Sequence, residues 1–311
     1  MSFGVLFPGQ GSQFVGMGTD LFDARPDLLG ERSDQILGWS LREMCLEGPE
    51  EALTRTEHAQ PALFALSYAL WDILAETLPS QPAGAVGHSL GEYTALTASG
   101  ALGYEAALGV VARRGEAMAT AADLEPSGMA ALIGADEDLA ASIAARRQHE
   151  GGRLQVANIN APGQVVLAGG ADDIVWLAAN ARDLGVRRAI PLKVAGAFHS
   201  SFMEPAADEV AGVLAELEVD RLAFPVWSNT TAIEHEPDTV SELLIRQVVS
   251  PVRFSECLLG MAASGIDTFV HVGPGDVTAG MARRSVENAT VVVVSTIDDI
   301  PTAVEVIGTM A

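Results

Sequence analysis

The sequence predicts an α/β fold in which helices cover a mostly parallel sheet, with a small ferredoxin-like subdomain inserted into it. Three observations support this prediction. Apolar, strand-like runs alternate with helix-like segments along most of the 311 residues, which is typical of a parallel sheet. Residues 124–194 change to the order β-α-β-β-α-β. Hydrophobic residues make up 49% of the chain, enough for a sizeable core.

The N-terminal segment is expected to begin with a short apolar strand at Phe3–Phe7. Residues 20–58 are polar and irregularly helical. A regular helix is expected over Pro61–Leu78, where leucines recur at helical spacing.

The next elements form a strand, a sharp turn and a helix. The strand is expected at Ala83–Val86 and the helix at Leu90–Ala98, and Gly87–Gly91 between them has the pattern Gly-x-Ser-x-Gly. This pattern is the sequence form of a nucleophile elbow, and it predicts an α/β-hydrolase-like core. Ser89 stands at the apex, and the amide of Leu90 would face an oxyanion formed there. A strand–turn–helix with a solvent-facing serine is the alternative.

The loop after the first strand carries glycines on both sides of Gln10, so the Gln10 backbone can approach another group closely. A phosphate-binding loop would need a Lys-Ser/Thr ending, which is missing. We therefore predict that the Gln10 amide is a second oxyanion donor, with an ordinary strand-to-helix loop as the alternative.

A further helix, expected at Tyr104–Ala122, carries Arg113 and Arg114 in its middle. Two arginines in mid-helix usually mark a solvated face. Apolar residues flank Arg114, however, so its guanidinium can be partly buried and would then need an anion.

The inserted segment divides the chain into a large part, residues 1–123 and 195–311, and a small part, residues 124–194. In the small part, strands are expected at 128–134, 154–158, 164–168 and 188–194, and helices at 136–147 and 172–184. In the C-terminal part, strands are expected at 224–228, 268–272 and 290–294, and helices at 204–217, 241–249, 254–263, from 277, and at 303–309.

Six histidines could supply the base that a serine nucleophile needs. His199 is favoured, because it lies in a Gly/Ala-rich loop from which a side chain can project into a cleft. His88 neighbours Ser89, but adjacent residues of an extended chain point to opposite faces. His235 lies between two glutamates and is expected in a surface loop, and His271 ends an apolar strand and is expected to be structural. His58 is expected in a polar loop, and His149 lies in the charged end of the inserted subdomain.

A base also needs a group that fixes its tautomer. If the helix containing Gln247 continues to Pro251, the Gln247 carbonyl lacks its usual donor, because proline has no N–H. This free carbonyl could hold Nδ1–H of His199. Water at a frayed helix end is the alternative partner.

The formal net charge of −23 argues against binding to nucleic acid or to anionic membranes. No apolar run has the length of a membrane-spanning helix, and the N-terminus shows no basic signal-peptide region. The two cysteines, Cys45 and Cys257, are isolated, which is typical of buried thiols in a cytoplasmic protein.

The motifs together resemble those of malonyl-coenzyme A:acyl carrier protein transacylases and of the related acyltransferase domains of polyketide and fatty acid synthases. The resemblance covers essentially the whole chain, and the order of the motifs makes it specific. The motifs are Phe7–Gln13, Gly87–Glu92, Arg114-Gly115, Asn160–Gln164, Gly196–Ser200, Gln247 ahead of Ser250–Arg253, and Val272–Gly275.

The resemblance implies a catalytic set that agrees with the reasoning from the residues. Ser89 is the acylated nucleophile and His199 is its base. Arg114 binds the malonyl carboxylate, and the Gln247 carbonyl orients the base. The implied oxyanion donors are Gln10 and Leu90, and the other implied substrate-binding residues are His88, Asn160 and Phe198. A phenylalanine before the histidine and a leucine after the serine resemble the malonyl-selective pattern of polyketide acyltransferases.

The resemblance also implies the partners: malonyl-CoA as substrate and an acyl carrier protein as acceptor, with no metal or cofactor. We expect a monomer. An acidic carrier protein requires a basic patch, and Arg187, Arg188 and Lys193 are the candidates, with a solvated strand end as the alternative. One departure from the family is Asp276, where lysine or an apolar residue often follows Gly-Pro-Gly.

Three other functions compete with malonyl transfer for fatty acid biosynthesis. The same chemistry could serve a polyketide synthase. A serine hydrolase such as a thioesterase is less favoured, because no acidic third member for His199 is evident and Arg114 would have no role. A non-catalytic scaffold that binds carrier protein is the third.

Overall fold

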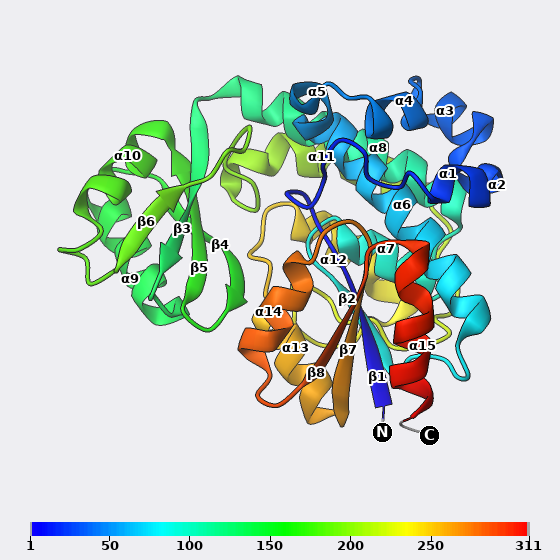
Figure 1. Cartoon of the computed structure of the whole chain (residues 1–311). Helices are drawn as coiled ribbons and strands as arrows, with labels where there is room; N and C mark the ends of the chain where they lie inside the picture. Colours follow the sequence, from blue (N-terminus) through cyan, green and yellow to red (C-terminus); the bar gives the residue numbers. More distant parts are fainter. Residues whose placement is uncertain (1, 310–311) are drawn as a thin grey trace.

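The computed structural model describes residues 2–309 and contains two sheets of four strands each (Figure 1). The first sheet has the strand order β2-β1-β7-β8, and all its pairs are parallel. Its strands are β1 (Ser2–Phe7), β2 (Gly84–Gly87), β7 (Ile266–Val272) and β8 (Thr290–Val294). The predicted α/β fold with a parallel sheet is therefore confirmed.

The central strand β1 shows why this sheet is covered on both faces. Val5 and Phe7 belong to the largest apolar cluster, whereas Leu6 between them packs in a separate cluster with Phe254 and Met281. All three β1 side chains are fully buried. Successive strand residues point to opposite faces, so β1 joins two cores.

Helices and short 3₁₀ turns surround this sheet. The elements before the second sheet are α1 (Leu21–Ala24), α2 (Pro26–Leu29), α3 (Glu31–Leu37), α4 (Leu41–Leu46), α5 (Glu50–Thr54), α6 (Thr56–Thr77), α7 (Gly91–Ala98) and α8 (Tyr104–Leu124). Those after it are η1 (Ser201–Met203), α11 (Glu204–Leu214), η2 (Pro237–Thr239), α12 (Val240–Gln247), α13 (Phe254–Ala263), α14 (Val277–Ser285), η3 (Ile297–Asp299) and α15 (Ile300–Gly308). No helix within residues 2–309 is long and apolar enough to cross a membrane.

The second sheet is antiparallel and has the order β4-β5-β3-β6. Its strands are β3 (Ser127–Ile133), β4 (Leu154–Ala161), β5 (Gln164–Gly170) and β6 (Arg188–Pro191), and its helices are α9 (Glu137–His149) and α10 (Ala171–Asn180). A separate apolar cluster, which includes Leu132, Leu154 and Leu177, lies between this sheet and its helices. This is the predicted ferredoxin-like order, and we propose residues 124–194 as the small subdomain.

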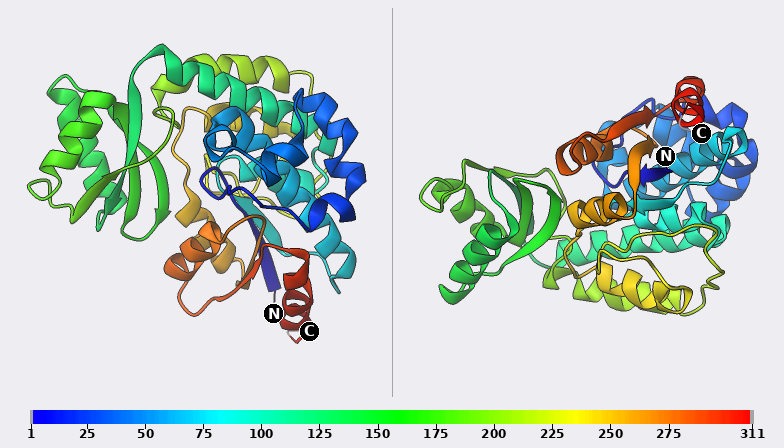
Figure 2. Two further views of the ribbon diagram at one scale, coloured as in Figure 1. Left: turned by 45° about the horizontal axis from the view of Figure 1, so that its top comes forward. Right: turned by 90° about the horizontal axis from the view of Figure 1, so that it is seen from below.

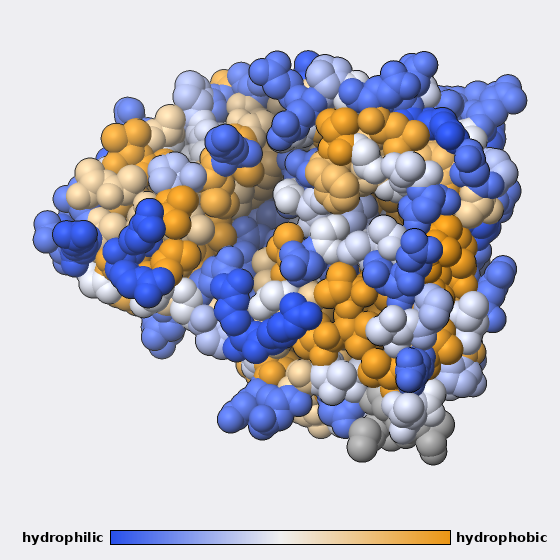
Figure 3. Space-filling view, viewed as in Figure 1, coloured by the Kyte–Doolittle hydropathy of each residue, from blue (hydrophilic) through white to orange (hydrophobic). Residues whose placement is uncertain are grey.

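The small subdomain projects from one end of the molecule, beyond the end of α8 (Figure 2). It also contacts the large part through β4, because Ile159 N donates to Val252 O at 2.8 Å and Val252 N to Ala157 O at 2.9 Å. The face seen in Figure 3 is hollowed between the two lobes.

Two predicted elements differ from the structure. The segment at 224–228 is not a regular strand and forms only isolated bridges, one of them between Val226 and Ala85 of β2. The long helix α6 begins at Thr56, before the predicted start, and contains Pro61 within its first turns. Pro61 is the sixth residue of this helix, so the Glu57 carbonyl lacks the i+4 donor that a residue with an N–H would supply.

Candidate active site

The turn around Ser89 requires its glycines. A Cβ on Gly87 would lie 1.8 Å from the carbonyl carbon of Gly91, and a Cβ on Gly91 would lie 2.5 Å from the carbonyl oxygen of Phe7. The strand end, the turn and the start of α7 therefore pack backbone against backbone. Ser89 itself has a φ of 51°, a left-handed conformation that a serine rarely adopts.

Two buried amide side chains hold this strained serine. Asn229 accepts from Ser89 N at 2.7 Å and donates to Gly87 O at 2.8 Å, so it bridges the two sides of the turn. Gln247 Nε2 donates to Ser89 O at 2.8 Å. The strain at Ser89 is thus offset by hydrogen bonds from segments far away in the sequence.

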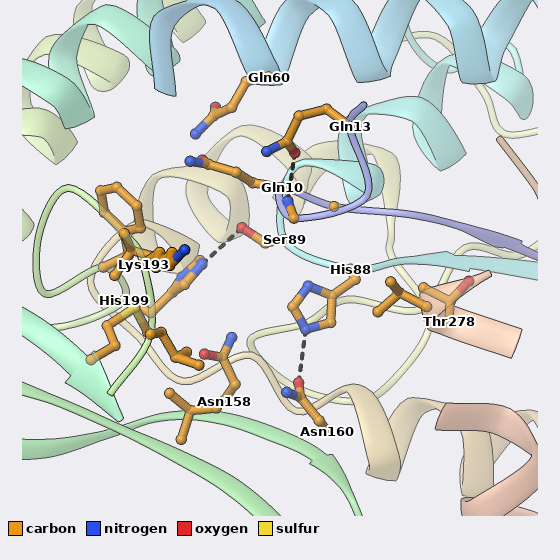
Figure 4. A pocket seen from close by; sticks show the side chains of 18 of the residues that line it. Gln10, Gln13, Gln60, His88, Ser89, Asn158, Asn160, Lys193, His199 and Thr278 are labelled. Atoms are coloured by element: carbon orange, nitrogen blue, oxygen red, sulfur yellow. Dashed lines mark hydrogen bonds between the residues drawn. The ribbon is translucent and has the colours of Figure 1, made fainter. Parts of the chain in front are cut away.

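The structure brings Ser89 and His199 together (Figure 4). Ser89 Oγ lies 2.7 Å from His199 Nε2, and His199 Nδ1 lies 2.8 Å from the main-chain oxygen of Gln247. A carbonyl oxygen can only accept, so Nδ1 carries the proton and Nε2 accepts from the serine hydroxyl. His199 is buried and, like Ser89, has a positive φ, of 58°.

The Gln247 carbonyl is available because α12 ends at this residue. The amide of Ser250 approaches the carbonyl only at 3.4 Å, and Pro251 has no N–H to offer. The helix does not continue to Pro251 as the sequence argument supposed, but the carbonyl still lacks a normal helical donor. It takes the place that a carboxylate holds in a Ser-His-Asp triad.

Arg114 lies on α8 with its side chain fully buried beside the serine. Its guanidinium donates to Gln60 Oε1 at 2.6 Å, to Gln247 Oε1 at 2.8 Å and to Ser89 Oγ at 3.1 Å, and Nε has no partner. Within residues 2–309 no carboxylate lies in salt-bridge contact with it, and burial lowers its pKa. A buried cation with only neutral partners can accept an anionic ligand.

The main-chain N–H groups of Gln10 and Leu90 lie in the two loops that follow β1 and β2, which pair in parallel. Neither N–H donates a hydrogen bond to another group in the described part of the chain. Parallel strands end at the same edge of a sheet, so both loops lie beside Ser89, and we propose these two amides as the oxyanion donors.

Gln10, Ser89 and His199 line a cavity of about 190 Å³ (Figure 4). The large part contributes Gln10, Gln60, His88, Ser89, Met118, Phe198 and His199 among others, and the small subdomain contributes Met129, Asn158, Asn160, Val166 and Lys193 among others. The nucleophile, the base and the buried arginine all come from the large part.

His88 points away from Ser89. Its Nε2 lies 2.8 Å from Asn160 Oδ1, and its ring packs edge-on against Phe254. Burial lowers the pKa of His88. The Oδ1 atom of Asn160 can only accept, so His88 is neutral with its proton on Nε2, and the pair links the two subdomains at the cavity.

The chain matches the family model described as "Acyl transferase domain" over residues 5–311. It belongs to the acyltransferase family. This acyltransferase is 39% identical over 303 residues to the malonyl CoA-acyl carrier protein transacylase of Bacillus subtilis, with 96% of this chain and 95% of the relative covered.

Two solved structures are similar over nearly the whole acyltransferase. The acyl carrier protein S-malonyltransferase of Vibrio cholerae is 36% identical, with a TM-score of 0.91 and coverage of 97% of this chain and 100% of that one. PlMCAT, a malonyl-transacylase in complex with the type II polyketide synthase carrier protein AntF, is 33% identical, with a TM-score of 0.92 and coverage of 98% and 99%.

The expected basic cluster of the acyltransferase is divided in the structure. Lys193 lines the catalytic cavity, whereas Arg187 and Arg188 line a separate groove together with Arg182. The separation follows from the extended chain, which advances about 3.3 Å per residue along β6 and its continuation.

Two histidines lie elsewhere than predicted. His235 is not in a surface loop: it is 5% exposed, and its Nε2 lies 2.6 Å from Glu92 Oε1. His58 lies in α6 and packs edge-on against Trp39. His271 is buried at the end of β7 and contacts Thr278 Oγ1 and Gly273 O, as expected for a structural residue.

Sequence reasoning missed three residues of the site: Gln60, Glu92 and Asn229. Glu92 stands in the Gly87–Glu92 motif, which was the only signal for it. Gln60 lies between the polar segment 20–58 and the helix expected from Pro61, and no motif pointed to it. Asn229 follows an expected strand, where functional side chains often lie.

The buried histidines predict acid sensitivity of the acyltransferase. Burial, and after it the nearby Arg114, lower the pKa of His199 to about 3, and burial lowers that of His271 to about 4. The unfolded chain takes up both protons near pH 6.5, before the native state does, so the free energy of unfolding falls as pH decreases below that value. We expect a slope approaching about 3 kcal/mol per pH unit by pH 5.

Urea unfolding at pH steps from 7 to 5 measures this slope, to which His88 adds because burial lowers its pKa as well. His271→Asn should reduce the slope by about 1.4 kcal/mol per pH unit, because the unfolded chain then takes up one proton fewer. A free energy of unfolding that stays constant over this range would contradict the prediction.

Proposed function

We propose that this acyltransferase transfers a malonyl group from malonyl-CoA to an acyl carrier protein through a malonyl-Ser89 intermediate. One observation carries the proposal: a fully buried arginine with only neutral partners lies 3.1 Å from the nucleophilic oxygen. A guanidinium at this point matches an acyl group that ends in a carboxylate.

The first half-reaction is acylation of the serine. His199 Nε2 takes the proton as Ser89 Oγ attacks the thioester carbonyl, and the amides of Gln10 and Leu90 stabilise the oxyanion. Collapse breaks the carbon–sulfur bond, and the proton passes from Nε2 to the sulfur of CoA. In the second half, the pantetheine thiol of the carrier protein gives its proton to His199 and attacks the malonyl-serine. Collapse of this second intermediate breaks the ester bond to Ser89 Oγ, and the proton passes from Nε2 to that oxygen, which restores the free serine. Neither half-reaction needs a metal or redox cofactor.

Selectivity follows from the same groups. An acyl group without a free carboxylate, such as acetyl, would leave the buried guanidinium of Arg114 without an anion. This costs several kcal/mol of binding free energy. Phe198 lines the cavity and is 6% exposed. We propose that Phe198, with Leu90, crowds the α-carbon of the acyl group and disfavours a methyl branch by about 1–3 kcal/mol.

Fatty acid biosynthesis is the pathway we propose, on the strength of the Bacillus subtilis relative. The likeness to PlMCAT, whose partner is a polyketide carrier protein, makes polyketide biosynthesis the second candidate. We further propose a monomer, since one chain supplies the whole cavity, and a cytoplasmic location, since both cysteines are free.

The discriminating experiment measures CoA release from malonyl-CoA with and without an acyl carrier protein that bears its pantetheine arm. A transferase releases about one equivalent of CoA per enzyme without carrier, and turns over when carrier is added. Sustained turnover without carrier would instead establish a hydrolase. Binding of carrier protein without any CoA release would support a non-catalytic scaffold as the only remaining function.

For carrier docking, we propose the groove formed by Arg182, Arg187 and Arg188. None of these three arginines forms a salt bridge within residues 2–309, although most other arginines do. Unpaired cations on a chain of net charge −23 are suited to an acidic partner. Lys193, in the cavity wall, would meet the incoming arm or the acyl group instead.

The double variant Arg187→Glu/Arg188→Glu is expected to raise the KM for carrier protein about tenfold, because reversed charge opposes electrostatic steering. The rate of serine acylation by malonyl-CoA should not change. Arg32→Glu/Arg221→Glu, which reverses the same number of charges at exposed arginines of the large part, is the matched control. Equal KM values for the double variant and the control would place docking elsewhere.

A further inference from the structure

A buried carboxylate lies directly behind the nucleophile, and the reaction steps above do not use it. Glu92 is in the first turn of α7 and has no exposed surface. Its carboxylate accepts three hydrogen bonds, from His235 Nε2 at 2.6 Å, Gln247 Nε2 at 2.7 Å and the main-chain N–H of Asn229 at 3.2 Å. Burying a carboxylate is costly unless it is paired in this way, so its position calls for an explanation.

The first link runs from Glu92 to the side chain of Gln247. The Nε2 atom of this amide faces two groups that only accept, the Glu92 carboxylate and the carbonyl of Ser89. The amide oxygen of Gln247 must therefore point the other way, where it accepts from Arg114 at 2.8 Å. Glu92 thus helps to fix which end of the amide the arginine meets.

The second link is electrostatic. Arg114 has no contacting carboxylate in the described residues, and only neutral groups hydrogen-bond to it. Glu92 is one amide away, and its negative charge favours the charged guanidinium. Both groups are buried, so their attraction is weakly screened.

His235 holds the carboxylate from the other side. Its side chain is fully buried, and its Nδ1 has no partner in the described part of the chain. A neutral ring with its proton on Nε2 donates to Glu92 and leaves only an acceptor unpaired. An amide at position 92 would disturb this arrangement. Its NH₂ group would oppose either Gln247 Nε2 or the N–H of His235, and moving the His235 proton to Nδ1 would leave a buried donor without a partner in the described part of the chain.

We propose that Glu92, held by His235, is a positioning residue for Arg114 that acts through the side-chain amide of Gln247 and so sets the preference for acyl groups bearing a carboxylate. The inference rests on the proposed function, because it concerns the selectivity of malonyl loading. Glu92 touches no reacting atom.

The test compares the second-order rates of enzyme acylation by malonyl-CoA and acetyl-CoA, measured by intact mass. Glu92→Gln is expected to lower the malonyl-to-acetyl ratio at least tenfold, because small displacements of a binding group cost up to about a hundredfold. Asp173→Asn is the matched control. This buried carboxylate of the small subdomain accepts hydrogen bonds from Arg147 Nε and from the main-chain N–H of Arg153, and it is far from Ser89 in the sequence. The control should leave the ratio unchanged even if it lowers stability.

A second variant separates positioning from a structural role. Gln247→Met removes the connecting amide and keeps the main-chain carbonyl for His199. Adding Glu92→Gln to it should change the ratio by a smaller factor than Glu92→Gln does alone, because only the direct attraction between Glu92 and Arg114 remains to be lost. An equal factor in both backgrounds would show that Glu92 does not act through the Gln247 amide. If Glu92→Gln does not fold, His235→Leu is the substitute, because it removes one hydrogen-bond donor to the Glu92 carboxylate. The malonyl-to-acetyl ratio of this variant should then be lower than that of the wild type.

The outcomes separate the two proposals. A wild-type enzyme that does not become malonylated overturns the proposed function. A wild-type enzyme that prefers malonyl, with a Glu92→Gln variant of equal preference, overturns only the role of Glu92.

Discussion

Replacing Ser89 by alanine is expected to abolish the malonyl adduct and to reduce transfer to carrier protein by at least about a thousandfold. The hydroxyl is the atom that accepts the acyl group, and no other nucleophile is paired with His199 at the cavity. Removing it deletes the covalent intermediate on which both half-reactions depend.

The intact mass of each enzyme after mixing with malonyl-CoA shows directly whether it carries a malonyl group. The wild type should gain the mass of one malonyl group, and Ser89→Ala should gain nothing while retaining its thermal unfolding midpoint. Asn229→Ala is an informative companion, because it keeps the hydroxyl but removes the bridge that holds the strained turn. An adduct of equal yield on Ser89→Ala would place the acylation site elsewhere.

Replacing Arg114 by alanine is expected to lower malonyl loading by about a hundredfold or more. Truncating one partner of a buried, hydrogen-bonded charge pair costs about 2–5 kcal/mol. Acetyl loading should fall much less, because an acetyl group has no carboxylate to pair. The malonyl-to-acetyl ratio of acylation rates is therefore the measurement.

The neighbouring residue provides the control. Arg113 is 59% exposed and pairs with Glu116, so Arg113→Ala removes an equal charge from the same helix without touching the cavity. Its acylation rates should match those of the wild type. Equal losses of malonyl and acetyl loading in Arg114→Ala would show that the arginine supports the site without binding the acyl carboxylate.

The sequence predicted the catalytic pair because local rules govern each member. Gly87 is required by a backbone contact with Gly91 in the same turn, and the loop before His199 is recognisable by its small residues. The contact that requires Gly91 is with Phe7 of the neighbouring strand, but the Gly-x-Ser-x-Gly pattern marks this position in the sequence. The missing N–H of Pro251 identified an acceptor for the base, although α12 ends earlier than supposed. Each inference depended on chemistry that a short segment contains.

The Glu92–His235 pair could not be predicted, because its members are 143 residues apart and no local pattern relates them. The two glutamates beside His235 indicated a surface loop. They are indeed exposed, but in an extended segment alternate side chains point in opposite directions, so His235 points inward. The charges of the two neighbouring glutamates therefore led to a wrong prediction of the burial of His235.

The basic cluster illustrates the same limit. Arg187, Arg188 and Lys193 are close in sequence, but an extended chain separates residues five apart by about 16 Å. The predicted strand at 224–228 had the right composition, yet β2, its neighbour, has only four residues and offers little edge for pairing.

The cavity wall is formed by residues of both the large part and the inserted subdomain. The atoms that react all belong to the large part, whereas the opposing wall, with Met129, Asn158, Asn160 and Val166, belongs to the inserted subdomain. Met129 and Val166 nevertheless pack in the largest apolar cluster, and the His88–Asn160 hydrogen bond joins the two walls. Exchanging the insert to change the space for the acyl chain would therefore leave every reacting atom in place, but it would have to preserve this shared core.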